Sequence, residues 1–151
     1  PPLYTEMTVD EYLEFAAALK KVPRADRARQ VDRAVERTRL GEVRRRLIRN
    51  LSKGYRQRVG IAQALLGDPE IIILDEPTRG IDVGAKRDIY LLLGNLVRQG
   101  KAVIMISSEI PELMGICDRI MVMCEGNYSG EVSREEFSQE RIMTLASAIK
   151  V

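Results

Sequence analysis

The chain contains no histidine and no tryptophan, and only two of its 151 residues are cysteines. Without histidine, a Ser-His-Asp triad, a Cys-His nucleophile pair and a His-ligated metal site are all excluded. Cys117 and Cys124 lack the spacing of metal ligands, so we expect two reduced thiols of a cytosolic protein.

Long apolar runs are absent as well. None approaches the roughly 20 residues that an α-helix needs to span a bilayer, and there is no signal-peptide pattern. The opening PPLYTEMTV carries no initiator methionine and has the character of an internal segment, so we expect a fragment of a longer chain. With 45% hydrophobic and 30% charged residues, the chain has enough apolar side chains to bury a core.

Charge is distributed unevenly, although the formal net charge is only +2. Residues 20–58 hold 15 Lys and Arg against 4 Asp and Glu, whereas the rest of the chain has an acidic excess. Such a basic block suits nucleic acid, a membrane surface or an acidic partner, and it equally suits a solvated helical face. The sequence leaves these alternatives open.

The first fifty residues have a helical pattern. Thr8 and Glu11 form a capping box at the start of a helix that ends before Pro23. A second helix is expected over 25–39, and a weaker helical stretch over 43–49. Because no strand pattern occurs here, we expect a helical subdomain at 1–50.

The second part of the chain alternates helices and strands. Short unbroken apolar runs at 71–74, 102–106 and 119–123 predict strands, the first two of them buried strands, with 71–74 covered on both faces. Ser52 and Asp82 are N-cap candidates for two of the intervening helices. The alternation indicates an α/β fold with a parallel sheet flanked by helices.

The expected organisation therefore has three parts. A partial α/β core at 51–133 follows the helical subdomain, and a C-terminal helix occupies 134–151. Ser133 and Glu136 have the spacing of a capping box for this last helix.

Candidate catalytic residues lie in the segment IIILDEPT. It places Asp75 and Glu76 at the carboxyl end of a buried strand, where ligands bind in open α/β sheets. One carboxylate at this edge can hold Mg²⁺ through its water shell, and the next can polarise an attacking water. Two acids ending an ordinary strand are the alternative, but four aliphatic residues before Asp-Glu-Pro-Thr favour the functional interpretation.

A second candidate is the loop in LSKGYRQRVG. Ser52, Lys53 and Gly54 supply a hydroxyl, an ammonium and a glycine amide just before a helix begins. A helix N-terminus attracts phosphate through its free N–H groups and partial positive charge, and glycine allows a ligand close to the backbone. Taken alone, Ser52 is equally well an ordinary N-cap.

Together, LSKGYRQRVGIAQALLGDPEIIILDEPT resembles the signature loop, signature helix and Walker B strand of an ATP-binding-cassette (ABC) transporter ATPase. The resemblance implies an incomplete P-loop NTPase fold that uses ATP and Mg²⁺. The family's signature is usually LSGGQ, so Lys53 and Tyr55 depart from it at the third and fifth positions.

The resemblance also implies a role for each matching residue. Ser52 and Gly54 contact the γ-phosphate of an ATP held by an opposing cassette. Asp75 is the Mg²⁺ ligand, Glu76 is the general base, and Asp82 belongs to the D-loop that crosses the dimer interface. The loop that contacts nucleotide comprises Ser52, Lys53, Gly54 and Tyr55.

The position of the family's switch histidine is taken by Ser108. A serine can hydrogen-bond a phosphate but carries no positive charge, so we expect slowed or differently arranged hydrolysis. Sequence after Thr78 resembles the second cassette of tandem monosaccharide importers, whereas the preceding part is more similar to exporter-type cassettes. The two halves suggest a composite chain that changes character near Thr78.

The Walker A loop, G-x-x-x-x-G-K-[ST], does not occur in the sequence. In this family each ATP lies between the Walker A loop of one cassette and the signature loop of another. The chain would keep the part offered to a partner's ATP, so we expect weak or no ATP binding and no steady hydrolysis by the isolated chain. We also expect the strands at 102–106 and 119–123, which flank the missing strand in the family, to pair directly or with another chain.

Three hypotheses follow. The first is an ATPase subunit fragment at the cytoplasmic face of the plasma membrane, paired head to tail with a second cassette and docked on transmembrane permease subunits. The second is a soluble cassette ATPase that binds nucleic acid, which is less favoured because basic-aromatic alternation is lacking. The third is a truncated or chimeric domain without activity of its own.

Overall fold

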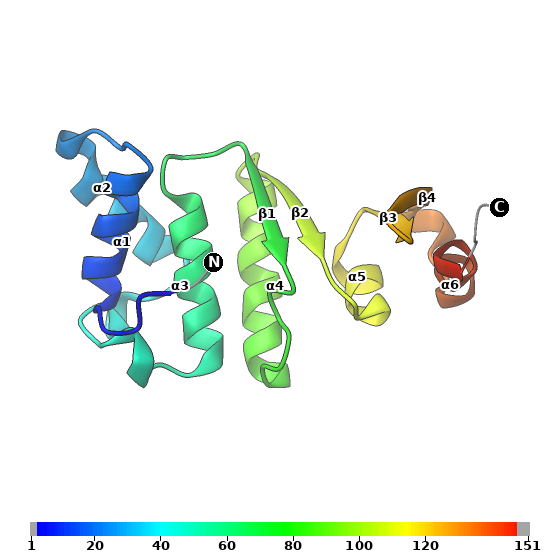
Figure 1. Cartoon of the computed structure of the whole chain (residues 1–151), viewed down its shortest axis with the longest axis horizontal. Coiled ribbons are helices and arrows are strands. Elements are labelled where there is room, and N and C mark those ends of the chain that lie inside the picture. Colours follow the sequence, from blue (N-terminus) through cyan, green and yellow to red (C-terminus); the bar gives the residue numbers. More distant parts are fainter. Residues whose placement is uncertain (1–2, 148–151) are drawn as a thin grey trace. The chain divides into compact units, whose positions relative to one another are not determined.

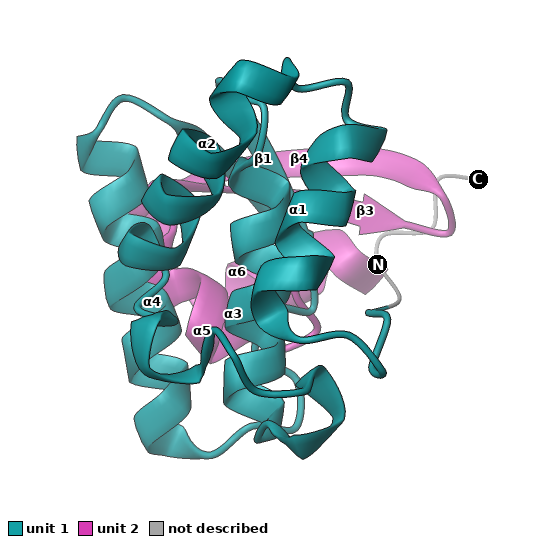
Figure 2. Ribbon diagram, turned by 90° about the vertical axis from the view of Figure 1, so that its left-hand side faces the viewer, with its two compact units in different colours: residues 1–106 teal, residues 107–151 magenta. Residues whose placement is uncertain are grey.

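The computed structural model describes residues 3–147, and its contacts divide the chain into two compact units, residues 1–106 and 107–151 (Figures 1 and 2). The division expected from the sequence pattern, into 1–50, 51–133 and 134–151, stays a prediction. Residues 1–2 of its first part and 148–151 of its last part lie outside the described residues.

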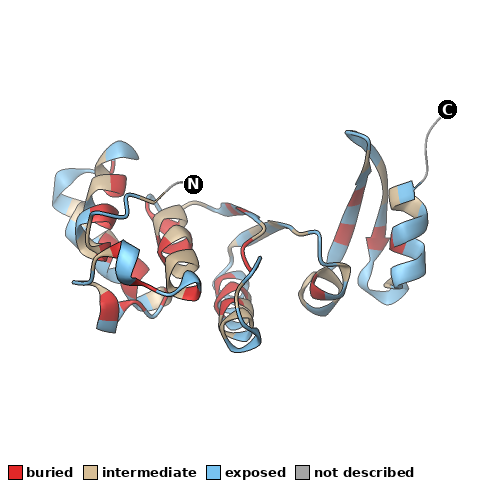
Figure 3. Ribbon diagram, turned by 60° about the horizontal axis from the view of Figure 1, so that its bottom comes forward, coloured by how far each residue is buried: buried red, intermediate tan, exposed pale blue. Residues whose placement is uncertain are grey.

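The first unit combines helices with a two-stranded sheet. Its elements in chain order are α1 (Val9–Leu19), α2 (Arg24–Arg37), the 3-10 helices η1 (Gly41–Val43) and η2 (Ile48–Asn50), α3 (Lys53–Leu65), β1 (Ile71–Asp75), α4 (Val83–Arg98) and β2 (Ala102–Ile106). One apolar core joins them, and Figure 3 shows its buried residues along the inner sides of the helices. Its largest fully buried side chains include Leu13, Leu40, Ile48, Leu66, Ile72, Ile89 and Leu96.

The capping box predicted for α1 is confirmed. The Glu11 N–H donates to the Thr8 hydroxyl at 3.3 Å, and the Thr8 N–H donates to the Glu11 carboxylate at 2.8 Å. The single helical stretch expected over 43–49 is wrong, because the structure has two short 3-10 helices, η1 and η2, with a turn between them, and this segment also bonds to the start of α1 and the chain before it. The Val9 N–H donates to the carbonyl of Arg46 at 3.2 Å, and the Ile48 N–H donates to that of Met7 at 2.9 Å.

Strands β1 and β2 are parallel, as predicted, with Ile71 opposite Ala102 and Asp75 opposite Ile106. The prediction that 71–74 is covered on both faces is wrong, and so is the prediction that 102–106 is a buried strand, since β2 has only exposed and half-buried residues. Ile72 is 2% exposed, whereas Ile73 is 65% exposed. Helices α3 and α4 contact this sheet and cover one of its faces. The other face, formed by every second residue of each strand, is exposed to solvent. The outward face includes Ile71, Ile73, Ile104 and Ile106.

The second unit packs two helices on an antiparallel hairpin. Its elements are α5 (Ile110–Ile116), β3 (Arg119–Cys124), β4 (Asn127–Ser133), the 3-10 helix η3 (Arg134–Glu136) and α6 (Gln139–Ser147). Their small core is formed by Ile120, Val122, Val132 and Ile142. The capping box of Ser133 and Glu136 is present, but it opens η3, and α6 begins later.

The expected direct pairing of 102–106 with 119–123 is wrong for the part of the chain that the structure describes. Strand β2 pairs with β1, and β3 pairs with β4. The strands of the hairpin are joined by a turn at Glu125 and Gly126, both with positive φ. Such a tight turn brings two strands together at a small cost in chain entropy, so the local partner is favoured.

Neither cysteine forms a disulfide, since Cys117 and Cys124 are both free thiols. Among the described helices, none has the length and apolar character that crossing a membrane requires.

Candidate functional site

The site begins at Ser52, which is the N-cap of α3 as predicted. Its hydroxyl oxygen accepts a hydrogen bond from the Tyr55 N–H at 3.3 Å, while the residue remains exposed. The first turn of α3 contains no acidic residue. An anion that approaches this end of the helix therefore meets free N–H groups and the positive end of the helix dipole.

The loop at the start of α3 lies against the segment that leads into α4. A β-carbon placed on Gly80 would stand 2.4 Å from the Lys53 ammonium, and one placed on Gly54 would stand 3.0 Å from the β-carbon of Ala85. Two glycines thus permit this close approach, and at Gly80 a φ of +69° also favours glycine. The structure therefore brings the predicted signature loop and D-loop together within one unit.

Asp82 is the N-cap of α4, as predicted, and its carboxylate accepts a hydrogen bond from the Ala85 N–H at 2.9 Å. The turn before it is held by a hydrogen bond of 3.3 Å from the Ile81 N–H to the carbonyl of Thr78, a residue that is buried. Figure 1 shows α3 and α4 beginning at the same end of the first unit, with β1 running toward that end. The candidate residues on these three elements thus gather at one end of the unit.

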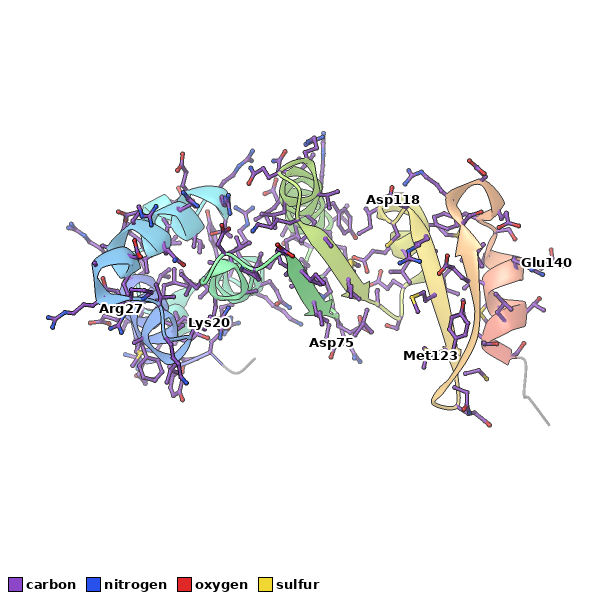
Figure 4. All side chains as sticks on the ribbon, turned by 90° about the horizontal axis from the view of Figure 1, so that it is seen from above. Lys20, Arg27, Asp75, Asp118, Met123 and Glu140 are labelled. Carbon is purple, nitrogen blue, oxygen red and sulfur yellow. The ribbon has the colours of Figure 1, made fainter. Side chains whose placement is uncertain are left out.

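Asp75 is the last residue of β1 and is exposed (labelled in Figure 4). Glu76 comes next, half-buried and with a φ of +47°. Its N–H donates to the carbonyl of Ile106 at 2.9 Å, which extends the pairing with β2 beyond Asp75. A left-handed conformation costs a non-glycine residue about 1 kcal/mol, and such strain is concentrated at functional sites.

Asp75 could hold Mg²⁺ only as a single protein carboxylate, with phosphate oxygens and water as the other ligands. The described residues contain no group of three or more Asp, Glu, Cys or His side chains able to hold a metal ion. Mg²⁺ in nucleotide sites is typically held by one or two carboxylates, with phosphate oxygens and water completing an octahedron. A single exposed carboxylate at the end of β1 is compatible with that donor set.

Tyr55 takes part in a network that the sequence did not reveal. Its hydroxyl donates to the carboxylate of Glu42 on η1, which raises the pKa of Tyr55. The Arg58 guanidinium lies 5.3 Å from the centre of the Tyr55 ring and donates to Asp88 on α4 at 2.5 Å. The spacing of Tyr55 and Arg58 on one helix signals their contact, but Glu42 and Asp88 are too distant in sequence to be inferred.

Ser108 belongs to the second unit, where it is exposed and precedes α5. Its neighbour Ser107 donates to the carboxylate of Glu112 at 2.6 Å and accepts a hydrogen bond from the Glu109 N–H at 3.1 Å. The structure therefore groups the other candidate residues in the first unit, and the role of Ser108 stays a prediction.

The family model described as ABC transporter matches residues 1–79. The ribose import ATP-binding protein RbsA of Clostridium perfringens is 45% identical over 144 residues, which is 95% of this chain and 29% of that protein. The xylose import ATP-binding protein XylG of Moorella thermoacetica is 55% identical over 101 residues, 67% of this chain and 20% of that protein. The chain thus spans less than a third of the length of these curated relatives.

Solved structures show the same fold. CbiO1 from Clostridium perfringens, part of the ABC transporter complex CbiONQ, matches with a TM-score of 0.80 and 30% identity, covering 93% of this chain and 56% of that chain. An ATP-binding cassette of an ABC transporter in its ADP conformation matches with a TM-score of 0.77 and 24% identity, covering 95% of this chain and 60% of the other.

Proposed function

Because the chain belongs to the ABC transporter family, we propose that it forms part of an ATP-binding subunit that drives the import of a monosaccharide. The observation that carries the proposal is the contact between the loop of Lys53 and the segment of Gly80. An exposed helix N-terminus and the exposed Asp82 lie on the two segments that meet here, which supports a phosphate site at this end of the unit.

The sugar class is proposed from the relatives. Two of them are named as ribose and xylose import proteins. The alignment with the ribose import protein covers 144 of 151 residues, so it runs across Thr78, where the sequence changes character. We propose a pentose or a related monosaccharide as the transported substrate.

Each site residue has a proposed part in the reaction. Ser52, Lys53 and Gly54, with Tyr55 fixing their helix, contact the phosphates of an ATP held by an opposing cassette. Asp75 supplies the carboxylate for Mg²⁺, and Glu76 polarises the attacking water as general base. Ser108 donates a hydrogen bond to phosphate without adding charge, and Asp82 lies at the interface with the partner.

The proposed partners are a second ABC ATPase subunit, paired head to tail, and transmembrane permease subunits at the cytoplasmic face of the plasma membrane. Part of the basic block is already engaged within the chain, which reduces the charge left for nucleic acid. Arg44 lies 2.9 Å from both Asp10 and Asp32, and Arg49 lies 2.7 Å from Glu6. Nucleic acid is therefore the less favoured partner.

Two substitutions at Ser52 test the proposal. Asp and Asn both cap a helix as well as Ser does, but only Asp adds negative charge where the γ-phosphate is expected. The chain is mixed with a cassette that has an intact Walker A loop, and ATP-dependent association is measured by light scattering. We expect association for the wild type and for Ser52→Asn, and a loss of at least tenfold in affinity for Ser52→Asp.

Hydrolysis by the chain alone is measured in the same series, and we expect none above background. The proposal fails if the wild-type chain shows no ATP-dependent association with the partner cassette, or if the Asp and Asn variants associate equally well.

A further inference from the structure

A pocket of about 150 Å³ lies between α2, the C-terminal end of α3 and the turn that leads into β1. Three of its lining residues are Arg29, Arg33 and Arg37. Their spacing of four residues places them in a row along one face of α2. The pocket therefore has a wall of guanidinium groups.

The pocket is well separated from the Ser52 site. Ser52 caps the N-terminus of α3, whereas the pocket is lined by Leu65 at the other end of that helix. Thirteen helical residues at about 1.5 Å each separate the two ends by roughly 20 Å. A ligand in this pocket would not be the nucleotide that Ser52 contacts.

Asp68 supplies negative charge to the pocket, and most of that charge is already compensated. The Lys101 ammonium lies 2.8 Å from its carboxylate and Arg37 lies 3.7 Å from it. The hydrogen bond from Lys101 is the main reason why the pKa of Asp68 is lowered. Because Lys101 offsets this carboxylate, positive charge from the arginine row remains in excess.

The three arginines differ in their ion pairs and in their exposure to solvent. Arg29 lies 2.6 Å from Asp26 on its own helix, so its charge is partly offset. The side chain of Arg37 is only 23% exposed, which weakens competition from water at its guanidinium. Arg37 lies 3.7 Å from Asp68, beyond hydrogen-bond distance, so its donors remain open to a stronger partner, and Arg33 lines the pocket from an exposed position.

Gln30 adds a polar side chain to the lining of the pocket. The side-chain oxygen of Gln30 accepts a hydrogen bond from the Gly67 N–H at 2.7 Å, which orients its amide nitrogen as a donor. Ala34, one turn further along α2, is 2% exposed and lines the pocket with apolar surface. The pocket thus combines several donors with an apolar side formed by Ala34 and Leu65.

We propose that this pocket binds a phosphate group, either of a free phosphate compound or of a lipid headgroup. Guanidinium groups bind phosphate oxygens through paired N–H donors, and a row of them suits a dianion. The cavity of about 150 Å³ has room for more than one water-sized group, so a phosphoryl group fits it. This site is independent of ATP binding between cassettes.

Calorimetric titration of the 151-residue chain with inorganic pyrophosphate tests the free ligand. We expect saturable binding, about tenfold weaker in Arg33→Gln and in Arg37→Gln. Asp68→Asn removes the carboxylate that competes with the ligand, so we expect it to bind pyrophosphate more tightly than the wild type does. Arg24→Gln, an exposed position on the same helix outside the pocket, is the matched control and should bind like the wild type.

Co-sedimentation with phosphatidylcholine vesicles, with and without phosphatidic acid, tests the lipid source. Binding to pyrophosphate or to phosphatidic acid vesicles that falls in the Arg33 and Arg37 variants supports the site, and the arm that responds identifies the source. Circular dichroism confirms that each variant is folded. The proposal is overturned if neither probe binds, if Arg24→Gln weakens binding as much as Arg33→Gln does, or if Asp68→Asn weakens it.

Discussion

The Arg58 guanidinium on α3 lies 2.5 Å from the Asp88 carboxylate on α4. The side chain of Arg58 is 13% exposed and that of Asp88 is 45% exposed, so the pair is partly shielded from water. It links the helix that Ser52 caps to the helix that Asp82 caps. The two helix N-termini of the candidate site are therefore held together by charge as well as by packing.

We expect this pair to show energetic coupling. In a double-mutant cycle with Arg58→Gln and Asp88→Asn, the coupling energy should be about 1 kcal/mol, because one partner is shielded and the other is half exposed. Urea unfolding of the four proteins measures it. Additive effects of the two substitutions would show that the contact contributes nothing.

Gly80 and Gly94 should respond to alanine with opposite signs. Gly80 has a φ of +69° and lies against Lys53, so Gly80→Ala should destabilise the chain by about 1 kcal/mol. Gly94 lies inside α4 with open space around it, so Gly94→Ala should stabilise by about 0.5–1 kcal/mol. Thermal unfolding of both variants measures the difference, and equal effects would contradict this account of Gly80.

The Tyr55 hydroxyl should contribute to stability through Glu42. Tyr55→Phe removes the donor and keeps the ring beneath Arg58, so we expect a loss of about 1 kcal/mol in the free energy of unfolding. Tyr4→Phe, in the segment before α1, is the control for losing a tyrosine hydroxyl outside this network. A Tyr55 variant as stable as the Tyr4 variant would rule out a stabilising role for the bond.

Neighbouring isoleucines of β1 should differ sharply. Ile72 is 2% exposed, so Ile72→Ala should cost about 2–4 kcal/mol, whereas Ile73 is 65% exposed and Ile73→Ala should cost less than about 1 kcal/mol. Chemical denaturation of both variants of the chain tests this order. The reverse order would mean that the other face of the sheet is the buried one.

The lowered pKa of Asp68 predicts a pH dependence. The folded state binds this proton less readily than the unfolded state, so the stabilisation is present above the usual value of 3.8. It is lost as the pH falls through the folded-state pKa. Unfolding of the wild type and of Asp68→Asn should therefore differ at neutral pH, and the difference should shrink as the pH falls below 3.8; a constant difference would contradict the assignment.

Local features of this chain were predictable from sequence because they depend on neighbours. The caps formed by Thr8, Ser52 and Asp82 follow from short-range spacing, and all three are present. The ABC ATPase fold class was predictable from one motif-rich segment, and the solved structures confirm it.

Features that depend on what packs against a segment were not predictable. The run IIIL cannot show which face of its sheet is covered, and 119–123 cannot show that its partner is the strand after a tight turn. Within the candidate site, Glu42 and Asp88 were missed because only the folded chain brings them to Tyr55 and Arg58.

Side chains alternate along β1, so Asp75 projects from the same surface as Ile71 and Ile73, which face solvent here. Any polypeptide that docks on those isoleucines would also dehydrate the surroundings of the Asp75 carboxylate. Removing water lowers the local dielectric and strengthens the attraction between that carboxylate and a cation. Assembly and ion capture would then be thermodynamically linked, with each step favouring the other.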